Sequence, residues 1–396
     1  MSMETWTSKK LKDITTKIGS GATPRGGKGA YHQKGMPLIR SLNIYDLNFN
    51  YDDLAFIDES QAEQLDNVTV EKDDVLLNIT GASVCRCTSV PEELAPARVN
   101  QHVSIIRADK KNLFGKYLKY VLVSPTYKRE LWGLARTGAT REALTKVDIE
   151  NFKIKLPDIK TQTRIASVLS AYDDLIENNE KRIKALEEMA QLLYTEWFIK
   201  FKYPGHEKVK MVDSGTEYGM VPEGWEVTKI DSLLKNVKRK IKLQTSEYQK
   251  TGLYPIVDQG KDFIAGYTDN EDIIYKDDLI VFGDHSRCFK YCNFIFACGA
   301  DGTQLLLTND SNRMPEILLY HVILNSGLQN FNYARHFKFL KAIRVIKPDS
   351  AIAQKFSMVA DATYIQIRAL RDKNIILCKI RDLLIPQLVT GKRLLN

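Results

Sequence analysis

A glycine-rich stretch near the N-terminus, Gly21 to Gly29, contains residue types that could bind phosphate. A Walker A loop needs the pattern G-x-x-x-x-G-K-[ST], in which backbone amides surround the phosphates and the final hydroxyl binds magnesium. Here Ala22 stands where the pattern requires its first glycine, and Gly29 stands where it requires serine or threonine. We therefore predict that this stretch binds no nucleotide, and we interpret it as a basic loop or a plain surface turn.

A histidine and three cysteines in the second half could suggest a zinc site: His285, Cys288, Cys292 and Cys298. Structural zinc sites usually contain cysteine pairs separated by two residues, and that spacing is missing here. Aromatic residues lie between these cysteines, which favours a buried strand. Cys85 and Cys87 are a weaker match still. We predict no metal ion and expect all six cysteines to be reduced thiols.

Motifs for catalysis are not recognisable in the sequence. A methyltransferase would need a glycine-rich cofactor loop and an Asn/Asp-Pro-Pro-aromatic motif, and neither is present. A Ser/His/Asp or Cys/His arrangement cannot be inferred from the order of the residues. His102, in a strand-like run, is interpreted as an ordinary, partly buried histidine rather than a catalytic base. We expect no catalytic centre in the chain.

The length of 396 residues allows two or three domains, and 44% hydrophobic with 27% charged residues is typical of globular proteins. No apolar run reaches the roughly 18–20 residues of a membrane span. The N-terminus lacks the apolar core of a signal peptide, so a cytoplasmic protein without membrane contact is expected. The net charge of +8 is compatible with a polyanionic partner but does not prove one.

The sequence contains an internal repeat. The opening from Trp6 to Ile14 resembles the stretch from Trp225 to Leu233, and Asp73 to Leu77 resembles Asp277 to Val281. Because a repeated pattern usually marks a repeated structural unit, the chain is predicted to contain two copies of one fold.

Two long helices repeat with an offset of 191 residues. Apolar or small residues recur at alternating steps of four and three, which predicts a coiled-coil seam. The first series is Ile165, Leu169, Tyr172, Ile176, Asn179, Ile183, Leu186, Ala190, Leu193 and Trp197; the second is Phe356, Ala360, Thr363, Ile367, Leu370, Asn374, Leu377, Arg381, Leu384 and Leu388. Pro386 is expected to kink or end the second helix.

The predicted fold class is α/β or α+β, with two globular domains separated by two long antiparallel helices and related by a pseudo-two-fold repeat. The expected order is a first globular domain over 1–157, a helix over 158–202, a linker over 203–222, a second globular domain over 223–350 and a helix over 351–396. Strands are predicted over Pro37–Ile44, Gln101–Arg107, Asp278–Phe282 and Thr303–Leu307, and helices over Gly115–Val123 and Pro315–Leu324.

The two seams can pair with each other or with partner proteins. In an antiparallel match Asn179 falls near Asn374, and a buried asparagine pair could fix the register; two exposed asparagines are the alternative. Each seam covers 33 residues and hence roughly 50 Å at 1.5 Å per residue. That length matches about one and a half turns of duplex DNA.

The ordered motifs resemble the specificity subunits of type I restriction-modification enzymes, and the resemblance covers nearly the whole chain. The matching stretches are Trp6–Ile14, Gly21–Pro24, Leu38–Ile44, Thr137–Leu144, Leu156–Ile176, Val221–Trp225 and Leu384–Lys392. The loops Gly260–Gly266 and Phe282–Arg287 differ from their first-half counterparts, as expected if the two halves read different sequences.

The resemblance implies a non-catalytic subunit with two target recognition domains, each reading one half of an interrupted, asymmetric double-stranded DNA site. It also implies two methylation subunits docked around the helices and two restriction subunits with motor and nuclease activity. S-adenosylmethionine, ATP and magnesium are expected in those partners and not in this chain. A coiled-coil scaffold protein that does not read DNA is the alternative.

Arginine, lysine and small polar side chains bind phosphates, while arginine, asparagine and glutamine read base edges. On this basis the first-domain candidates for DNA contact are Thr23, Arg25, Lys28, Tyr31, Arg40, Ser41, Asn43, Thr80, Arg86, Gln101, Thr140 and Arg141. The second-domain candidates are Lys238, Arg239, Lys240, Gln259, Lys261, His285, Ser286, Arg287, Gln304, Tyr333, Arg335 and His336. A DNA contact is also open for His102.

Overall fold

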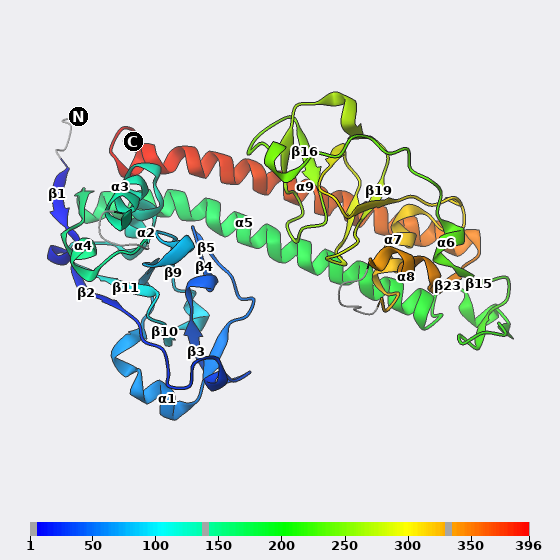
Figure 1. The fold of residues 1–396 in the computed structure, drawn as a ribbon, viewed down its shortest axis with the longest axis horizontal. Helices are drawn as coiled ribbons and strands as arrows, with labels where there is room; N and C mark the ends of the chain where they lie inside the picture. The colour runs from blue at the N-terminus through cyan, green and yellow to red at the C-terminus, as the bar shows by residue number, and fades with distance from the viewer. Residues whose placement is uncertain (1–5, 137–141, 329–334, 396) are drawn as a thin grey trace. The chain divides into compact units, whose positions relative to one another are not determined.

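The computed structural model describes residues 6–136, 142–328 and 335–395, which form two compact units. Unit 1 comprises residues 1–178 and 373–396, and unit 2 comprises residues 179–372. Each unit mixes sheets with helices (Figure 1). Helix α5 (Ile159–Tyr194) and helix α9 (Ser350–Val389) each continue from one unit into the other, so each unit contains a segment of both.

The strands of unit 1 form two main sheets. The first has the order β6-β3-β10-β7, and the second has the order β2-β11-β8-β9. Their bounds are β2 Thr15–Ser20, β3 Met36–Ile39, β6 Ala55–Ile57, β7 Thr69–Val70, β8 Val75–Asn78, β9 Cys87–Ser89, β10 Ala97–Val99 and β11 Val103–Ala108. The remaining elements are β1 Thr7–Lys10, β4 Ile44–Tyr45, β5 Asn48–Phe49, β12 Lys153–Leu156, α1 Glu59–Gln64, α2 Gly115–Val123, α3 Pro125–Arg136 and α4 Lys146–Asn151.

Unit 2 repeats most of this topology, although its second sheet has three strands among the described residues where that of unit 1 has four. One sheet has the order β17-β16-β21-β18, and the other has the order β20-β19-β22. The bounds are β16 Tyr254–Val257, β17 Gly266–Thr268, β18 Ile274–Tyr275, β19 Leu279–Gly283, β20 Phe289–Cys292, β21 Phe296–Cys298 and β22 Thr303–Leu306. The remaining elements are β13 Met211–Asp213, β14 Met220–Pro222, β15 Glu226–Lys229, β23 Arg344–Lys347, α6 Ile230–Leu233, α7 Glu316–Leu324 and α8 His336–Ala342.

Strand pairing confirms the repeat that the sequence predicts. In unit 1, β3 and β10 are parallel, and Leu38 lies opposite Arg98. In unit 2, β16 and β21 are parallel in the same way, and Ile256 lies opposite Ala297. The other pairs of these sheets are antiparallel in both units.

The long helices begin for the same local reason. Each follows a Pro-Asp pair, and the aspartate accepts hydrogen bonds from backbone amides of the first turn, which otherwise have no partner within a helix. Asp158 accepts from the amides of Lys160 and Thr161 at 2.9 and 3.0 Å, and Asp349 accepts from that of Ile352 at 3.0 Å. Pro386 does not end α9, which continues to Val389.

Within each unit the segments of α5 and α9 run antiparallel. In unit 1, Ile165 and Leu169 share a core cluster with Ile385 and Leu388. In unit 2, the Glu187 carboxylate pairs with Arg371 at 2.7 Å. None of the described seam residues is classed as exposed, and Asn374 donates to the carbonyl oxygen of Ile176 at 3.3 Å.

The predicted strand over residues 37–44 was too long. Strand β3 ends at Ile39, and residues Ser41–Asn43 form a 3-10 turn. The amide of Arg40 donates to the side chain of Asn43 at 3.0 Å, which closes this turn. The other predicted strands and both short helices agree with β11, β19, β22, α2 and α7 within two residues.

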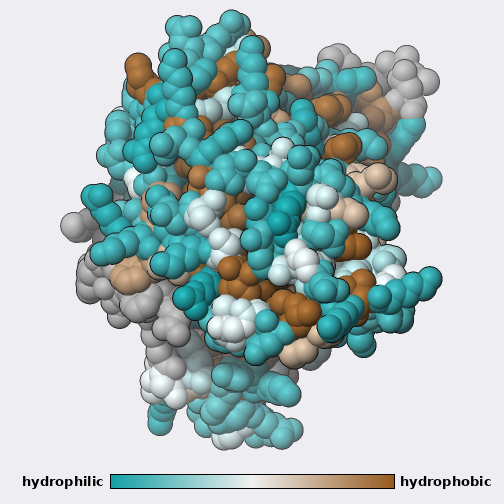
Figure 2. Space-filling view, turned by 90° about the vertical axis from the view of Figure 1, so that its right-hand side faces the viewer, coloured by the Kyte–Doolittle hydropathy of each residue, from teal (hydrophilic) through white to brown (hydrophobic). Residues whose placement is uncertain are grey.

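Among the described residues, no helix is long and apolar enough to cross a membrane. The face drawn in Figure 2 is mostly hydrophilic, and its hydrophobic residues lie in small groups between polar ones. That distribution is ordinary for a protein surface in contact with water.

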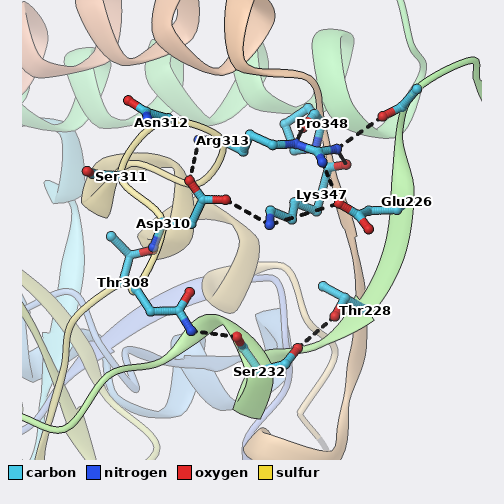
Figure 3. Close-up of polar contacts among 12 residues, drawn as sticks. Glu226, Thr228, Ser232, Thr308, Asp310, Ser311, Asn312, Arg313, Lys347 and Pro348 are labelled. Carbon is cyan, nitrogen blue, oxygen red and sulfur yellow. Dashed lines mark hydrogen bonds and ion pairs between the residues drawn. The ribbon is translucent and has the colours of Figure 1, made fainter.

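A polar network ties β15 and β23 of unit 2 to the segment before α7. Lys347 lies between two carboxylates, those of Asp310 at 2.8 Å and Glu226 at 3.9 Å (Figure 3). Arg313 donates to the carbonyl oxygens of Pro348 at 2.8 Å and Gly224 at 3.0 Å. The network therefore connects strand ends with the loop that leads into α7.

The hydrogen bond from Lys347 lowers the pKa of Asp310. Because the pKa is lower in the folded state, the ionised carboxylate stabilises the fold at neutral pH. This stabilisation is lost as pH falls below the ordinary aspartate pKa of about 3.9 and through the lowered value. We expect Asp310→Asn to lower the melting temperature at pH 7 and to have a smaller effect at pH 3. Asp277→Asn, at an exposed position, is the control, and equal effects at both pH values would contradict the prediction.

Candidate nucleic-acid interface

Three loops of unit 1 meet where β3 and β8 end and β11 begins. The backbone amide of Asn100 donates to the carbonyl oxygen of Ile39 at 3.0 Å, and the backbone amide of Ile79 donates to the carbonyl oxygen of His102 at 3.0 Å. The side chain of Asn78 donates to the carbonyl oxygen of Ser41 at 2.9 Å. These bonds hold the three loops together as one surface.

A row of polar side chains crosses this loop surface. The Thr80 hydroxyl lies 2.6 Å from Nδ1 of His102, and Nε2 of His102 lies 3.2 Å from Nε2 of Gln101. Gln101 also contacts the hydroxyl of Thr23, and both of these side chains are exposed. The structure thus brings together predicted residues from three separate segments and adds His102 to them.

Arg40 and Asn43 differ in what they can offer a ligand. The Arg40 guanidinium is half-buried, lies 5.2 Å from the Tyr31 ring centroid and donates to the carbonyl oxygen of Asp53. Asn43 is 0% exposed, and its amide donates to the carbonyl oxygens of Asn50 and Asp52 at 2.9 and 3.3 Å. Asn43 therefore supports its loop from inside and is unsuited to contact DNA.

The remaining first-domain candidates are more dispersed. Arg86 lies over the ring of Tyr45 at 4.5 Å, and that ring is 43% exposed. Arg25 is exposed, and Lys28 lies in the 3-10 turn Gly27–Ala30. Thr140 and Arg141 lie outside the described residues. Tyr45 was not among the predicted candidates, although an exposed aromatic beside an arginine is suited to nucleic acid.

The equivalent loops of unit 2 meet in the same place, around the start of β22. The side chain of Gln259 donates to the carbonyl oxygen of Asp301 at 2.7 Å and accepts from the amide of His285 at 3.4 Å. A Cβ added to Gly302 would lie 2.7 Å from the His285 ring, and one on Gly283 would lie 2.0 Å from the Ser286 hydroxyl. Glycine at both positions permits this close approach of the loops.

A basic cleft of about 300 Å³ lies beside this cluster. Arg239 donates to the side chain of Gln304 at 2.9 Å, and Lys242 donates to the carbonyl oxygen of Thr303 at 2.5 Å. Lys235 and Lys341 also line the cleft, and Lys341 pairs with Asp231 at 2.9 Å. The sequence already places five cations within eight residues, at Lys235, Lys238, Arg239, Lys240 and Lys242. Lys341 was not predicted, because only the fold brings it beside this basic run.

The other second-domain candidates vary in exposure. Lys238, Lys240, Lys261 and Arg335 are exposed, whereas Arg287 is half-buried with a backbone φ of 59°. His336 is 3% exposed, and its Nδ1 lies 2.8 Å from the carbonyl oxygen of Asp284, so it is unsuited to contact DNA. Tyr333 lies outside the described residues.

The cysteines considered for metal binding lie mostly in the core. Burial raises the pKa values of the Cys292 and Cys87 thiols, and it raises that of Cys298 to about 11 and that of Cys85 to about 12. A buried thiol of this kind is a poor ligand and nucleophile because the thiolate is disfavoured. Within the described ranges, no three His, Cys, Asp or Glu residues are grouped so that they could hold a metal ion.

The chain is similar to several known proteins. Residues 3–188 match the family model for the type I restriction modification DNA specificity domain. The type I restriction enzyme MjaIX specificity subunit of Methanocaldococcus jannaschii is 25% identical over 98% of this chain and 93% of its own length.

A second relative is the type I restriction enzyme HindI specificity subunit of Haemophilus influenzae, 25% identical over 37% of this chain and 32% of its own length. The crystal structure of a type I restriction-modification system S subunit from M. genitalium has a TM-score of 0.58 at 16% identity, over 97% of this chain and 96% of that one. The predicted resemblance to specificity subunits and the predicted fold class are confirmed.

Proposed function

We propose that this chain reads a DNA sequence for a type I restriction-modification system and that each unit reads one half of a bipartite site. The observation that carries the proposal is the repeated loop surface. The two units share most of their sheet topology and present polar or basic side chains at the same strand ends, among them the exposed Gln101 in unit 1 and the half-buried Gln304 beside the exposed Arg239 in unit 2. Loops that differ in sequence but lie on similar sheets are suited to read two different half-sites.

We further propose that α5 and α9 set the spacing of the half-sites and dock the methylation subunits. With 36 and 40 residues, these helices are roughly 54 and 60 Å long at 1.5 Å per residue. The surface of α9 carries apolar side chains, including Ile376 at 56% and Leu383 at 66% exposure. Exposed apolar residues on a paired helix are suited to a partner protein.

In this proposal all chemistry lies in the partners. Two methylation subunits would hold S-adenosylmethionine and transfer its methyl group to adenine N6, and two restriction subunits would use ATP and magnesium. This chain would contribute DNA binding and positioning. The support from this chain is that its loop surfaces carry polar and basic side chains of the types that bind phosphates and base edges.

Mapping of methylated adenines in cells that express this chain with its methylation subunits tests the function. The expected result is one interrupted DNA motif with a fixed gap. Alanine at Gln101 should then relax one half of the motif, and alanine at Gln304 should relax the other, since each lost base contact costs about 1–3 kcal/mol. Methylation without a sequence motif would support the scaffold alternative instead.

Docking on α9 predicts a separate result. Leu383→Glu should abolish co-purification with the methylation subunit, because it places a charge in an apolar contact, while thermal unfolding of the isolated chain stays unchanged. Leu253→Glu, at a residue of 72% exposure outside the helices, is the matched control. If both variants co-purify normally, this surface of α9 is not the docking site.

A further inference from the structure

The internal repeat breaks at one position beside the long helices. In unit 1, Asp173 on α5 accepts hydrogen bonds from Lys119 at 3.0 Å and Tyr120 at 2.6 Å, and it pairs with Arg381 on α9 at 2.8 Å. These four side chains fill the space between α2, α5 and α9.

The corresponding residues of unit 2 have no such ionic group. With the helix offset of 191, residue 173 corresponds to Tyr364 (173 + 191) and residue 381 to Ala190 (381 − 191). Helices α2 and α7 both have nine residues, so Lys119 and Tyr120, at the fifth and sixth positions, correspond to Tyr320 and His321. Alanine thus replaces the arginine, so the ion pair of unit 1 is not repeated at these positions.

A cavity of about 700 Å³ occupies this place in unit 2. Its volume lies in the range of sites for small organic ligands. Aromatic residues supply much of its wall: Phe263, Phe289, Tyr291, Tyr320 and Tyr364. Arg371 lies 3.8 Å from the centroid of the Phe263 ring and pairs with Glu187 at 2.7 Å. Such walls can stack against a planar ring.

Two amides at this cavity have hydrogen-bonding capacity left over. Gln191 donates to Oδ1 of Asn325 at 2.6 Å, and Asn325 donates to Oε1 of Gln191 at 3.2 Å and to the carbonyl oxygen of His321 at 2.7 Å. Nδ1 of His321 lies 3.3 Å from the same Oε1. Counting two N–H groups and two acceptor sites per amide, the described residues leave one N–H on Gln191 and one acceptor site on Asn325.

His321 adds a buried polar atom to the wall. It is 1% exposed, and its Nε2 has no hydrogen-bond partner among the described residues. Burial lowers the pKa of His321 to about 4, so the ring is neutral at pH 7 and offers a nitrogen acceptor. Buried polar groups normally have partners, and His321 is one of the residues that line this cavity.

We propose that this cavity of unit 2 binds a nucleobase, as a free nucleoside or nucleotide. The base would stack on the aromatic walls, donate an amino N–H to Asn325 and accept the remaining N–H of Gln191 at a ring nitrogen. Adenine presents an amino donor beside a ring-nitrogen acceptor, which is the complementary pair. The proposal does not depend on the proposed DNA-reading function, because it concerns a different surface.

Titration of the full chain with adenosine, followed by calorimetry, tests the proposal. We expect saturable binding with one site per chain, at least tenfold weaker for N6,N6-dimethyladenosine, which has no amino hydrogen. Gln191→Leu should weaken adenosine binding at least tenfold, whereas Gln366→Leu, at an exposed position of α9, should leave it unchanged. Binding that is absent at millimolar adenosine, or unaffected by Gln191→Leu, overturns the proposal.

A second variant removes ambiguity from misfolding. Leu192→Trp changes a residue that lines the cavity and is 64% exposed, so it should narrow the cavity without disturbing the core. We expect this variant to keep its cooperative thermal unfolding and to lose adenosine binding. Unchanged binding in the folded variant would place adenosine elsewhere and overturn the assignment.

Discussion

Replacement of Asp173 by alanine is expected to lower the free energy of unfolding of unit 1 by about 3–5 kcal/mol, the cost of removing one partner from a buried ion pair. Asp173 is 17% exposed and holds the charges of Lys119 and Arg381, which are each 12% exposed. Without the carboxylate, these two cations remain close together and poorly solvated. Urea denaturation followed by circular dichroism measures the effect.

Two variants control this experiment. Asp174→Ala removes the neighbouring carboxylate, which is exposed, and should change stability by less than about 0.5 kcal/mol. Asp173→Asn keeps the shape and one hydrogen-bond acceptor, so its effect should fall between the two. An Asp173→Ala variant as stable as Asp174→Ala would mean that the cluster contributes nothing to the fold.

Replacement of Lys238, Arg239 and Lys240 together by alanine should weaken DNA binding by about two orders of magnitude near 0.15 M salt. Each phosphate contact contributes about 0.9 to the slope of log affinity against log salt, so three contacts contribute roughly 2.7. All three side chains are exposed, and Arg239 is held by Gln304 at 2.9 Å. Titration of labelled duplex at several salt concentrations, with methylation subunits present, measures affinity and slope together.

A second triple variant separates local contacts from total charge. Alanine at Lys202, Lys208 and Lys210 removes the same net charge from exposed positions of the segment before β14. We expect its salt slope to stay close to that of the unaltered chain. If both triple variants weaken binding equally, long-range charge accounts for the effect and the basic run of 238–240 is not a phosphate contact.

Patterns that depend on near neighbours in the chain could be predicted from sequence. The helix periodicity and the apolar strand at β19 are local features, and the structure agrees with both predictions. The strand predicted over 37–44 was too long because the Asn43 side chain accepts a hydrogen bond from the amide of Arg40 and closes a turn that periodicity does not reveal.

The candidate interface was predictable by residue type but not by exposure. Gln101, Gln304 and Arg239 lie on the loop surfaces as expected, whereas Asn43 and His336 are buried. The burial of these two side chains depends on loops that the fold brings against them, such as Asn50 against Asn43 and Asp284 against His336. Nothing in the adjacent sequence records those contacts.

By itself the sequence determined that the chain carries one fold twice, that long helices with apolar seams accompany the copies, and that polar and basic residues gather in the divergent loops. These properties follow from residue type and spacing, which act over a few residues. Only the tertiary structure decided which loops meet at the strand ends, which candidates face solvent, and that Asp173 and Arg381 form an ion pair in unit 1 while a cavity lies beside Tyr364 in unit 2. Those outcomes depend on packing between residues far apart in the chain, where a single change of volume or charge alters what the site can bind.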